Sequence, residues 1–134
     1  MSTGTLPNDL DPANIRILVL DDNPHIRDIF GSMLQSAGYQ VTLADSGQVA
    51  LNHIDQWGPP DLAIVDLNMP GMSGFEFCER VQKRHELPVI FMTVADDQGS
   101  IVRGLDQYAE DYIIKPASTA QLLSRVRRVL RRLA

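Results

Sequence analysis

The sequence contains a single cysteine, and no stretch of apolar residues in it approaches the length of a membrane helix. One cysteine, Cys78, cannot close an internal disulfide, which excludes a disulfide-stabilised secreted scaffold and fits a reducing compartment. A membrane span needs roughly 20 consecutive apolar residues, so we expect none. The first 14 residues lack the basic and apolar parts of a secretory signal. These absences together predict a soluble, cytoplasmic protein.

Positive charge is also scarce. Lysine and arginine total 12 residues against 17 aspartates and glutamates, which gives a net charge of −5. A general affinity for nucleic acid or for anionic membrane surfaces is therefore not expected. Hydrophobic residues make up 44% of the 134 residues, enough for the core of one ordinary domain. We expect a flexible leader over residues 1–13 and a single domain over residues 14–134.

Short apolar segments alternate with segments of helical periodicity. The expected strands are residues 15–20, 40–44, 62–65, 89–92 and 112–114. The expected helices are residues 24–37, 47–57 and 98–108, and two that begin at the capping pairs Ser73 with Glu76 and Ser118 with Gln121. Nearly continuous apolar strands are typical of a parallel sheet that is covered on both faces. The alternation predicts a doubly wound, flavodoxin-like (βα)5 fold of the α/β class, with strand order 2-1-3-4-5.

Polar side chains follow four of the expected strands. Asp21 and Asp22 come after the first strand, Asp66 after the third, Thr93 after the fourth and Lys115 after the fifth. In open α/β sheets, ligands bind beyond the carboxyl ends of the strands. We therefore expect these side chains to converge at one edge of the sheet.

The expected cluster suits the transfer of a phosphoryl group. Three neighbouring carboxylates repel one another, and a divalent cation such as Mg²⁺, which prefers carboxylate and phosphate oxygens, relieves that repulsion. The Lys115 ammonium can balance the remaining charge and bind an anion. Phosphoryl transfer depends mainly on such positioning and charge neutralisation. Asp66 is then the expected nucleophile, because a carboxylate can form an acyl phosphate.

Four segments also resemble a known family. They are IRILVLDDNPHIR, DLAIVDLNMPGMSGFEF, VIFMTVA and DYIIKP, which stand in the order and at the spacings of response-regulator receiver domains. The resemblance extends over residues 15–133. It implies a switch of two-component signalling that is controlled by phosphorylation, rather than an enzyme, with only weak autophosphorylation and autodephosphorylation.

The resemblance implies a magnesium site. Asp66 would be the phosphoacceptor, and Asp22 and Asp66 would bind the metal ion. The backbone carbonyl of Asn68 would be a further ligand, and Asp21 would act through a water molecule.

The resemblance also implies three residues that respond to the phosphoryl group. Lys115 would bind its oxygens, and Thr93 would donate a hydrogen bond to one of them. Tyr112 matches the aromatic switch residue that turns inward when Thr93 is drawn toward the phosphate. The Lys115–Pro116 peptide bond is expected to be cis.

Two positions depart from the family pattern. Val94 stands where a small residue usually follows the switch hydroxyl, so it could narrow access to the phosphoryl group. Tyr108 stands where glycine often precedes the fifth strand, which leaves the shape of that turn open. Neither change removes a chemical group from the expected site.

The implied partners are a histidine kinase or phosphotransfer protein and a downstream effector or output domain. Ile29, with His25 and Ser32 on adjacent turns, could dock a helical phosphodonor. The alternative is that Ile29 is a residue at the flank of the core. The arginines of the last helix favour the helix dipole and solubility, or they contact an acidic partner. A homodimer through the fourth helix, fifth strand and fifth helix is a further option, whereas no DNA-recognition motif is present.

Two other functions are compatible with parts of the pattern. A phosphatase of the haloacid dehalogenase type would use Asp21 as its nucleophile, but Asn23 stands where that family has a second aspartate. A phosphate-independent pseudo-receiver would act only as an interaction module. The complete acidic set with Lys115 argues against the second alternative, and Val94 leaves it open.

Overall fold

In the computed structural model, which describes residues 11–94 and 107–133, five parallel strands form one sheet in the order β2-β1-β3-β4-β5. The strands are β1 Arg16–Leu20, β2 Gln40–Ala44, β3 Leu62–Asp66, β4 Val89–Thr93 and β5 Asp111–Ile114. The helices are α1 Pro24–Ser36, α2 Gly47–Trp57, α3 Gly74–Gln82 and α5 Thr119–Leu133. Most of the predicted helix over residues 98–108 lies outside the described residues. The observed strand order confirms the predicted flavodoxin-like arrangement.

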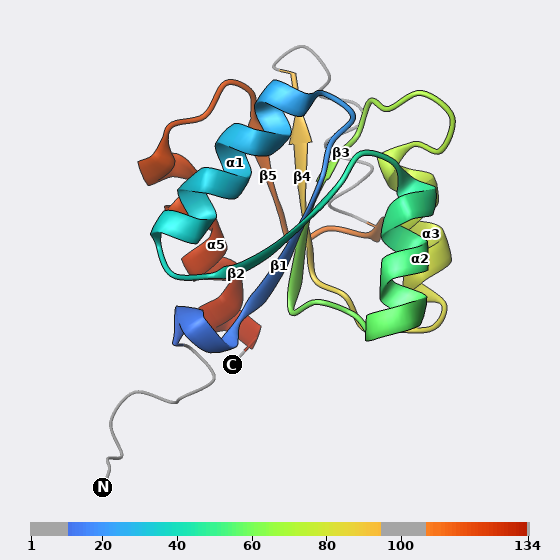
Figure 1. Cartoon of the computed structure of the whole chain (residues 1–134), viewed down its shortest axis with the longest axis horizontal. Coiled ribbons are helices and arrows are strands. Elements are labelled where there is room, and N and C mark those ends of the chain that lie inside the picture. Colours follow the sequence, from blue (N-terminus) through green and yellow to red (C-terminus); the bar gives the residue numbers. More distant parts are fainter. Residues whose placement is uncertain (1–10, 95–106, 134) are drawn as a thin grey trace, which may run out of the picture.

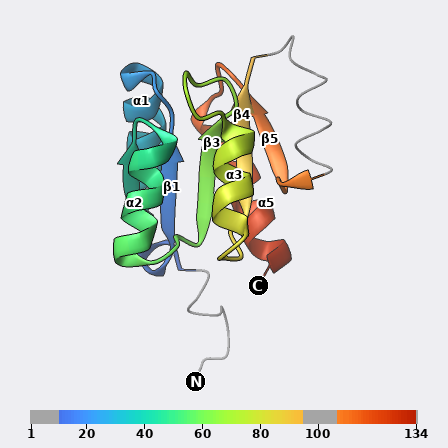
Figure 2. The same cartoon turned by 90° about the vertical axis from the view of Figure 1, so that its right-hand side faces the viewer.

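The helices cover both faces of the sheet. In Figure 1, α1 and α5 lie on one side of the strands, and α2 and α3 lie on the other. Figure 2 shows α2 and α3 in front of the strands, with β5 at the edge of the sheet. Because β1 and β3 are central, their side chains are enclosed from both sides, which explains their nearly continuous apolar sequences.

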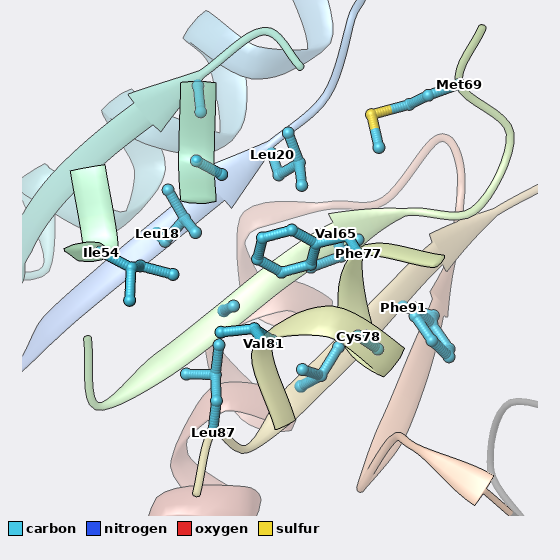
Figure 3. Packing of buried hydrophobic residues seen from close by; sticks show 14 of the residues in the cluster. Leu18, Leu20, Ile54, Val65, Met69, Phe77, Cys78, Val81, Leu87 and Phe91 are labelled. Carbon is cyan, nitrogen blue, oxygen red and sulfur yellow. The ribbon is translucent and has the colours of Figure 1, made fainter. Parts of the chain in front are cut away.

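The core consists of two layers, one on each face. Leu18, Val65 and Phe91 pack against α2 and α3, where Phe77 and Cys78 complete the layer (Figure 3). The layer on the opposite face is formed under α1 and α5 by the residues that alternate with these, among them Ile17, Val19, Ile64, Ile90 and Ile113. Fully burying one such side chain contributes about 1.5–3 kcal/mol. Burial raises the pKa of the Cys78 thiol to about 12, which agrees with a core role and not with a nucleophile.

Helix ends form where the sequence predicts them. The Asn23 side chain accepts hydrogen bonds from the N–H groups of His25 and Ile26 at the start of α1. Ser118 and Gln121 form a reciprocal capping box before α5, with distances of 2.9 and 3.1 Å. After α1, Gly38 adopts a φ of 101°, a conformation that favours glycine. The caps of α1 and α5 set where these two helices begin, and so they fix the loops that follow β1 and β5.

The start of the described chain packs onto the sheet. Pro12–Asn14 form a 3-10 turn that is capped by the Asp11 side chain. The amide of Gln40 donates to the Ala13 carbonyl and joins this turn to β2. Residues 1–10 lie outside the described residues, so the flexible leader stays a prediction. Within residues 11–94 and 107–133, no helix has both the length and the apolar character that crossing a bilayer requires.

Candidate functional site

Three carboxylates gather at the carboxyl ends of β1 and β3. Asp21 and Asp22 directly follow β1, and Asp66 is the last residue of β3. One carboxylate oxygen from each lies within 4.8 Å of the others. Asp21 and Asp66 are buried, whereas Asp22 is exposed. The predicted acidic cluster is therefore assembled in space, with one face open to solvent.

Lys115 supplies the opposing charge. Its Nζ atom lies 3.0 Å from Oδ2 of Asp21 and 3.3 Å from Oδ1 of Asp66. The lysine follows β5, and its backbone N–H donates to the Thr93 carbonyl at 2.8 Å, which holds it beside the end of β4. The peptide bond to Pro116 is cis, as predicted. One ammonium thus bridges two buried carboxylates that would otherwise repel each other.

Further hydrogen bonds hold Asp21 and Asp66 in place. Oδ1 of Asp21 accepts from the Asn23 N–H at 2.9 Å, and Oδ1 of Asp66 accepts from the Asn68 N–H at 3.1 Å. Nη1 of Arg27 donates to the Asp21 carbonyl oxygen at 3.0 Å. This role of Arg27 was not among the predictions from the sequence. Arg27 lies in the first turn of the helix that follows the aspartate pair, and this position was the signal in the sequence that could have indicated the contact.

Asp66 resists ionisation in this setting. Burial is the main cause that raises its pKa, to about 6, and the neighbouring Asp21 charge adds to the rise. The Asn68 N–H and the Lys115 ammonium act in the opposite direction. One ammonium neutralises only part of the negative charge of the two carboxylates. The remaining charge favours a divalent cation, and the carboxylate oxygens are the hard ligands that Mg²⁺ prefers.

Thr93 and Tyr112 lie on neighbouring strands. Thr93 ends β4 and is fully buried, so the predicted hydroxyl is at the same edge of the sheet as the acidic cluster. Tyr112 is half-buried on β5, where it pairs in register with Phe91. Val94 directly follows Thr93 and is 46% exposed. The backbone carbonyl of Tyr108 accepts a hydrogen bond from the Gln82 side chain, so the turn before β5 is tied to the end of α3.

Gly74, which follows Ser73 in the segment after β3 and reads in sequence as a simple turn residue, lies against the site. It is the first residue of α3, and a Cβ atom on it would lie 2.6 Å from the Asp66 carbonyl oxygen. Its N–H donates to the Leu67 carbonyl at 3.3 Å. Any side chain at position 74 would therefore displace the loop that begins at Asp66.

The expected docking residues share one face of α1. His25, Ile29 and Ser32 are all exposed, and Ile29 is 50% exposed. The interpretations of Ile29 as a docking residue and as a flank residue of the core both stay predictions at this exposure. All three side chains are accessible to a partner.

Comparison with known proteins identifies similar sequences. Residues 17–127 match the family model described as a response regulator receiver domain. The chain is 38% identical over 117 residues to a probable transcriptional regulator, ycf27, of Guillardia theta. The match covers 87% of this chain and 46% of the relative, so the chain spans about half the length of that protein.

Solved structures agree with this match. The chemotaxis protein CheY4 of Vibrio cholerae is 32% identical with a TM-score of 0.78, and the match covers 86% of this chain and 98% of that one. A putative two-component system response regulator/GGDEF domain protein is 29% identical with a TM-score of 0.86. That match covers 91% of this chain and 51% of the other.

Proposed function

The chain belongs to the response regulator receiver domain family of two-component signalling, and from this premise we propose that it is a switch which accepts a phosphoryl group on Asp66. The observation that carries the proposal is the contact of one ammonium, that of Lys115, with both buried carboxylates of the acidic cluster. Such a site neutralises negative charge at the point where a phosphoryl group would arrive. Receiver domains are signalling modules, and we assign no turnover of a substrate beyond slow acquisition and loss of the phosphoryl group.

The proposed cofactor is Mg²⁺. Asp22, Asp66 and the backbone carbonyl of Asn68 would hold it, and Asp21 would act through a water molecule. The bound ion would supply positive charge that shields the approach of a phosphate to the carboxylates. The spacing of the three carboxylates supports this assignment, since their oxygen atoms lie within 4.8 Å of one another.

The proposed reaction transfers a phosphoryl group from a phosphohistidine of a histidine kinase or phosphotransfer protein. A carboxylate oxygen of Asp66 forms a bond to phosphorus while the phosphorus–nitrogen bond of the donor breaks. The electron pair of that bond remains on the imidazole, which then takes up a proton. Lys115 would bind the oxygens of the resulting acyl phosphate, and the Thr93 hydroxyl would donate a hydrogen bond to one of them. Asp66 must be ionised for this step, a condition met at neutral pH even with its pKa raised to about 6.

The proposed readout passes through Thr93 and Tyr112. Movement of the Thr93 hydroxyl toward the phosphoryl group would leave space into which the Tyr112 ring turns. The surface around β5 and α5 would change with it and control an effector, an output domain or a second copy of the chain. The relative described as a response regulator/GGDEF domain protein supports the output-domain option, because its name pairs a response regulator with a further domain.

The exposed α1 face formed by His25, Ile29 and Ser32 is the proposed docking surface for the phosphodonor. It begins directly after the loop that carries Asp21 and Asp22. A helix of the donor seated there would bring its histidine to the acidic cluster. The proposed setting is the cytoplasm, in keeping with a lone cysteine that is buried and reduced.

Acetyl phosphate with Mg²⁺ tests this function. We expect mass spectrometry of the intact protein to show one added phosphoryl group, and peptide mapping to place it on Asp66. Asp66→Asn should abolish the label, whereas Asp21→Asn should keep it and weaken the binding of Mg²⁺. Labelling of Asp21, or turnover of free phosphate esters, would favour the phosphatase alternative. No label with any small phosphodonor would favour a phosphate-independent interaction module.

A further inference from the structure

Arg125 of α5 contacts Asp111 at the start of β5. Its Nη1 atom donates to both carboxylate oxygens of Asp111, at 3.1 and 3.3 Å. Asp111 alternates with Tyr112 along β5, so it shares the face of Ile113 beneath α5, whereas Tyr112 packs against the layer beneath α2 and α3. Because β5 is the edge strand, the arginine can reach residues on both faces. The Arg125 side chain is 38% exposed, whereas that of Asp111 is 11% exposed.

Asp111 is a fixed anchor for this arginine. It pairs in register with Ile90 of β4, and its Oδ1 atom also accepts the N–H of Tyr112 at 2.8 Å. The same carboxylate therefore holds the backbone of Tyr112 and the guanidinium of Arg125. A charge-assisted hydrogen bond to a mostly buried carboxylate restricts the guanidinium to one place.

In that place the guanidinium lies against the Tyr112 ring. The Cζ atom of Arg125 is 5.8 Å from the ring centroid, within the range of a cation–π contact. A cavity of about 180 Å³ adjoins the ring and is lined also by Ile114, Ala117 and Gln121. Tyr112 is partly buried and also packs against the core layer beneath α2 and α3, so the guanidinium is the polar contact of a ring that otherwise meets apolar neighbours.

We propose that Arg125 is a positioning residue that holds the Tyr112 ring at the outer edge of β5 and so opposes its inward turn. The inference rests on the proposed role of Tyr112 as the switch residue. The inward position would separate the ring from the guanidinium, which Asp111 keeps at the edge. Arg125 thus sets how strongly the resting state is favoured before a phosphoryl group arrives. A ligand that favours the inward state has to overcome this contact, so its apparent affinity is reduced accordingly.

Neighbouring arginines do not share this geometry. Arg128, one turn further along α5, is exposed, and no ion pair or ring contact joins it to any residue within 11–94 and 107–133. It has the same charge on the same helix, and it is therefore a matched control. Arg125→Gln retains an amide donor for Asp111 but removes the cation, whereas Arg125→Lys retains a cation.

The first measurement uses the protein without a phosphodonor. NMR signals of the Tyr112 ring, assigned by their absence in Tyr112→Leu, should shift or broaden in Arg125→Gln. They should stay close to wild type in Arg125→Lys and in Arg128→Gln. Unchanged ring signals in Arg125→Gln, or an equal change in Arg128→Gln, would overturn the inference. If Arg125→Gln does not fold, the pair Asp111→Asn with Arg125→Gln removes the carboxylate and its cation together and is measured instead.

The second measurement is the affinity for beryllofluoride with Mg²⁺. We expect Arg125→Gln to bind about two- to fivefold more tightly than wild type, the range expected when a partly exposed cation–π contact is removed. The gain should disappear in a Tyr112→Leu background, because there is then no ring to hold. An equal gain without the ring would contradict a role through Tyr112. If the wild type takes up no beryllofluoride, the proposed function fails, and the ring signals alone decide the role of Arg125.

Discussion

The backbone of Gly74 lies directly against the backbone of Asp66, and a Cβ atom at position 74 would lie 2.6 Å from the Asp66 carbonyl oxygen. Gly74 begins α3, and Asp66 ends β3, so the loop between the two elements is closed by this contact. Carbonyl oxygen and α-carbon atoms of the backbone cannot move aside as the end of a flexible side chain can. The position of the proposed phosphoacceptor therefore depends on the absence of a side chain at position 74.

Gly74→Ala should destabilise the protein by about 1–3 kcal/mol, the usual cost of forcing an extra carbon into a closed site. Chemical denaturation followed by circular dichroism measures the unfolding free energy. Gly31→Ala is the control, because the added Cβ would meet only the end of the Leu43 side chain, at 2.9 Å, and that side chain can move. Equal unfolding free energies for Gly74→Ala and wild type would contradict the close approach.

Asp66 should destabilise the metal-free protein at neutral pH. Its folded-state pKa of about 6 exceeds the ordinary value of 3.8, so the folded protein binds this proton more tightly than the unfolded chain does. The unfolding free energy should then fall as the pH rises from about 4 through about 6. A difference of about two pKa units corresponds to about 3 kcal/mol. Asp66→Asn should remove this contribution and be more stable than wild type at pH 7.5, but not at pH 4.

Denaturation of both proteins across this pH range, without Mg²⁺, measures the effect. All other titratable groups are common to the two proteins, so their contributions cancel in the difference between the two curves. Asp28→Asn, at an exposed position of α1, is the control and should follow the wild-type curve. Parallel curves for wild type and Asp66→Asn would show that the carboxyl group is not perturbed.

The sequence predicted the elements that carry their own local signal. Apolar strands that stop at a polar residue placed Asp21 and Lys115 at one edge, because parallel strands bring their carboxyl ends together. The observed strands β3 and β4 include Asp66 and Thr93 as their last residues, one position beyond the predicted ends. These two side chains are polar, so hydrophobic pattern alone excludes them from a strand although the backbone pairing continues.

Roles that depend on distant packing carried no such signal. Gly74 is an ordinary turn residue in sequence, and only the folded chain shows how close its backbone comes to Asp66. Arg125 is one of several arginines in α5, and nothing in the helix distinguishes it from Arg128. Its partner Asp111 lies on the edge strand, so the contact requires the sheet order and the helix position together.

Lys115 should stabilise the metal-free protein, because its ammonium reduces the repulsion between two neighbouring carboxylates. Lys115→Met would leave Asp21 and Asp66 without their shared cation, and removing one partner of a buried ion pair costs about 3–5 kcal/mol. The lysine side chain is 17% exposed, so we expect about 2–3 kcal/mol here. Lys83→Met is the matched control, since Lys83 is the other lysine and is exposed.

A second substitution identifies the cause of this loss. Asp21→Asn in the Lys115→Met background removes one of the two uncompensated charges, so it should recover part of the unfolding free energy. Mg²⁺ should stabilise Lys115→Met more than it stabilises wild type. A double variant no more stable than Lys115→Met would mean that the lysine acts through packing and not through charge.

Val94 should slow the loss of the phosphoryl group from Asp66. It directly follows the buried Thr93 at the end of β4, and a β-branched side chain there would restrict the approach of water to the site. Val94→Ala should speed hydrolysis of the acyl phosphate by roughly threefold or more, measured by loss of label after acetyl phosphate is removed. Because Val94 is 46% exposed, the unfolding free energy should change by less than about 1 kcal/mol.

The matched control is Val49→Ala on α2, where the side chain is 47% exposed. It removes the same atoms at a position away from β4 and should leave the hydrolysis rate unchanged. If both substitutions change the rate equally, the effect does not come from access to the site.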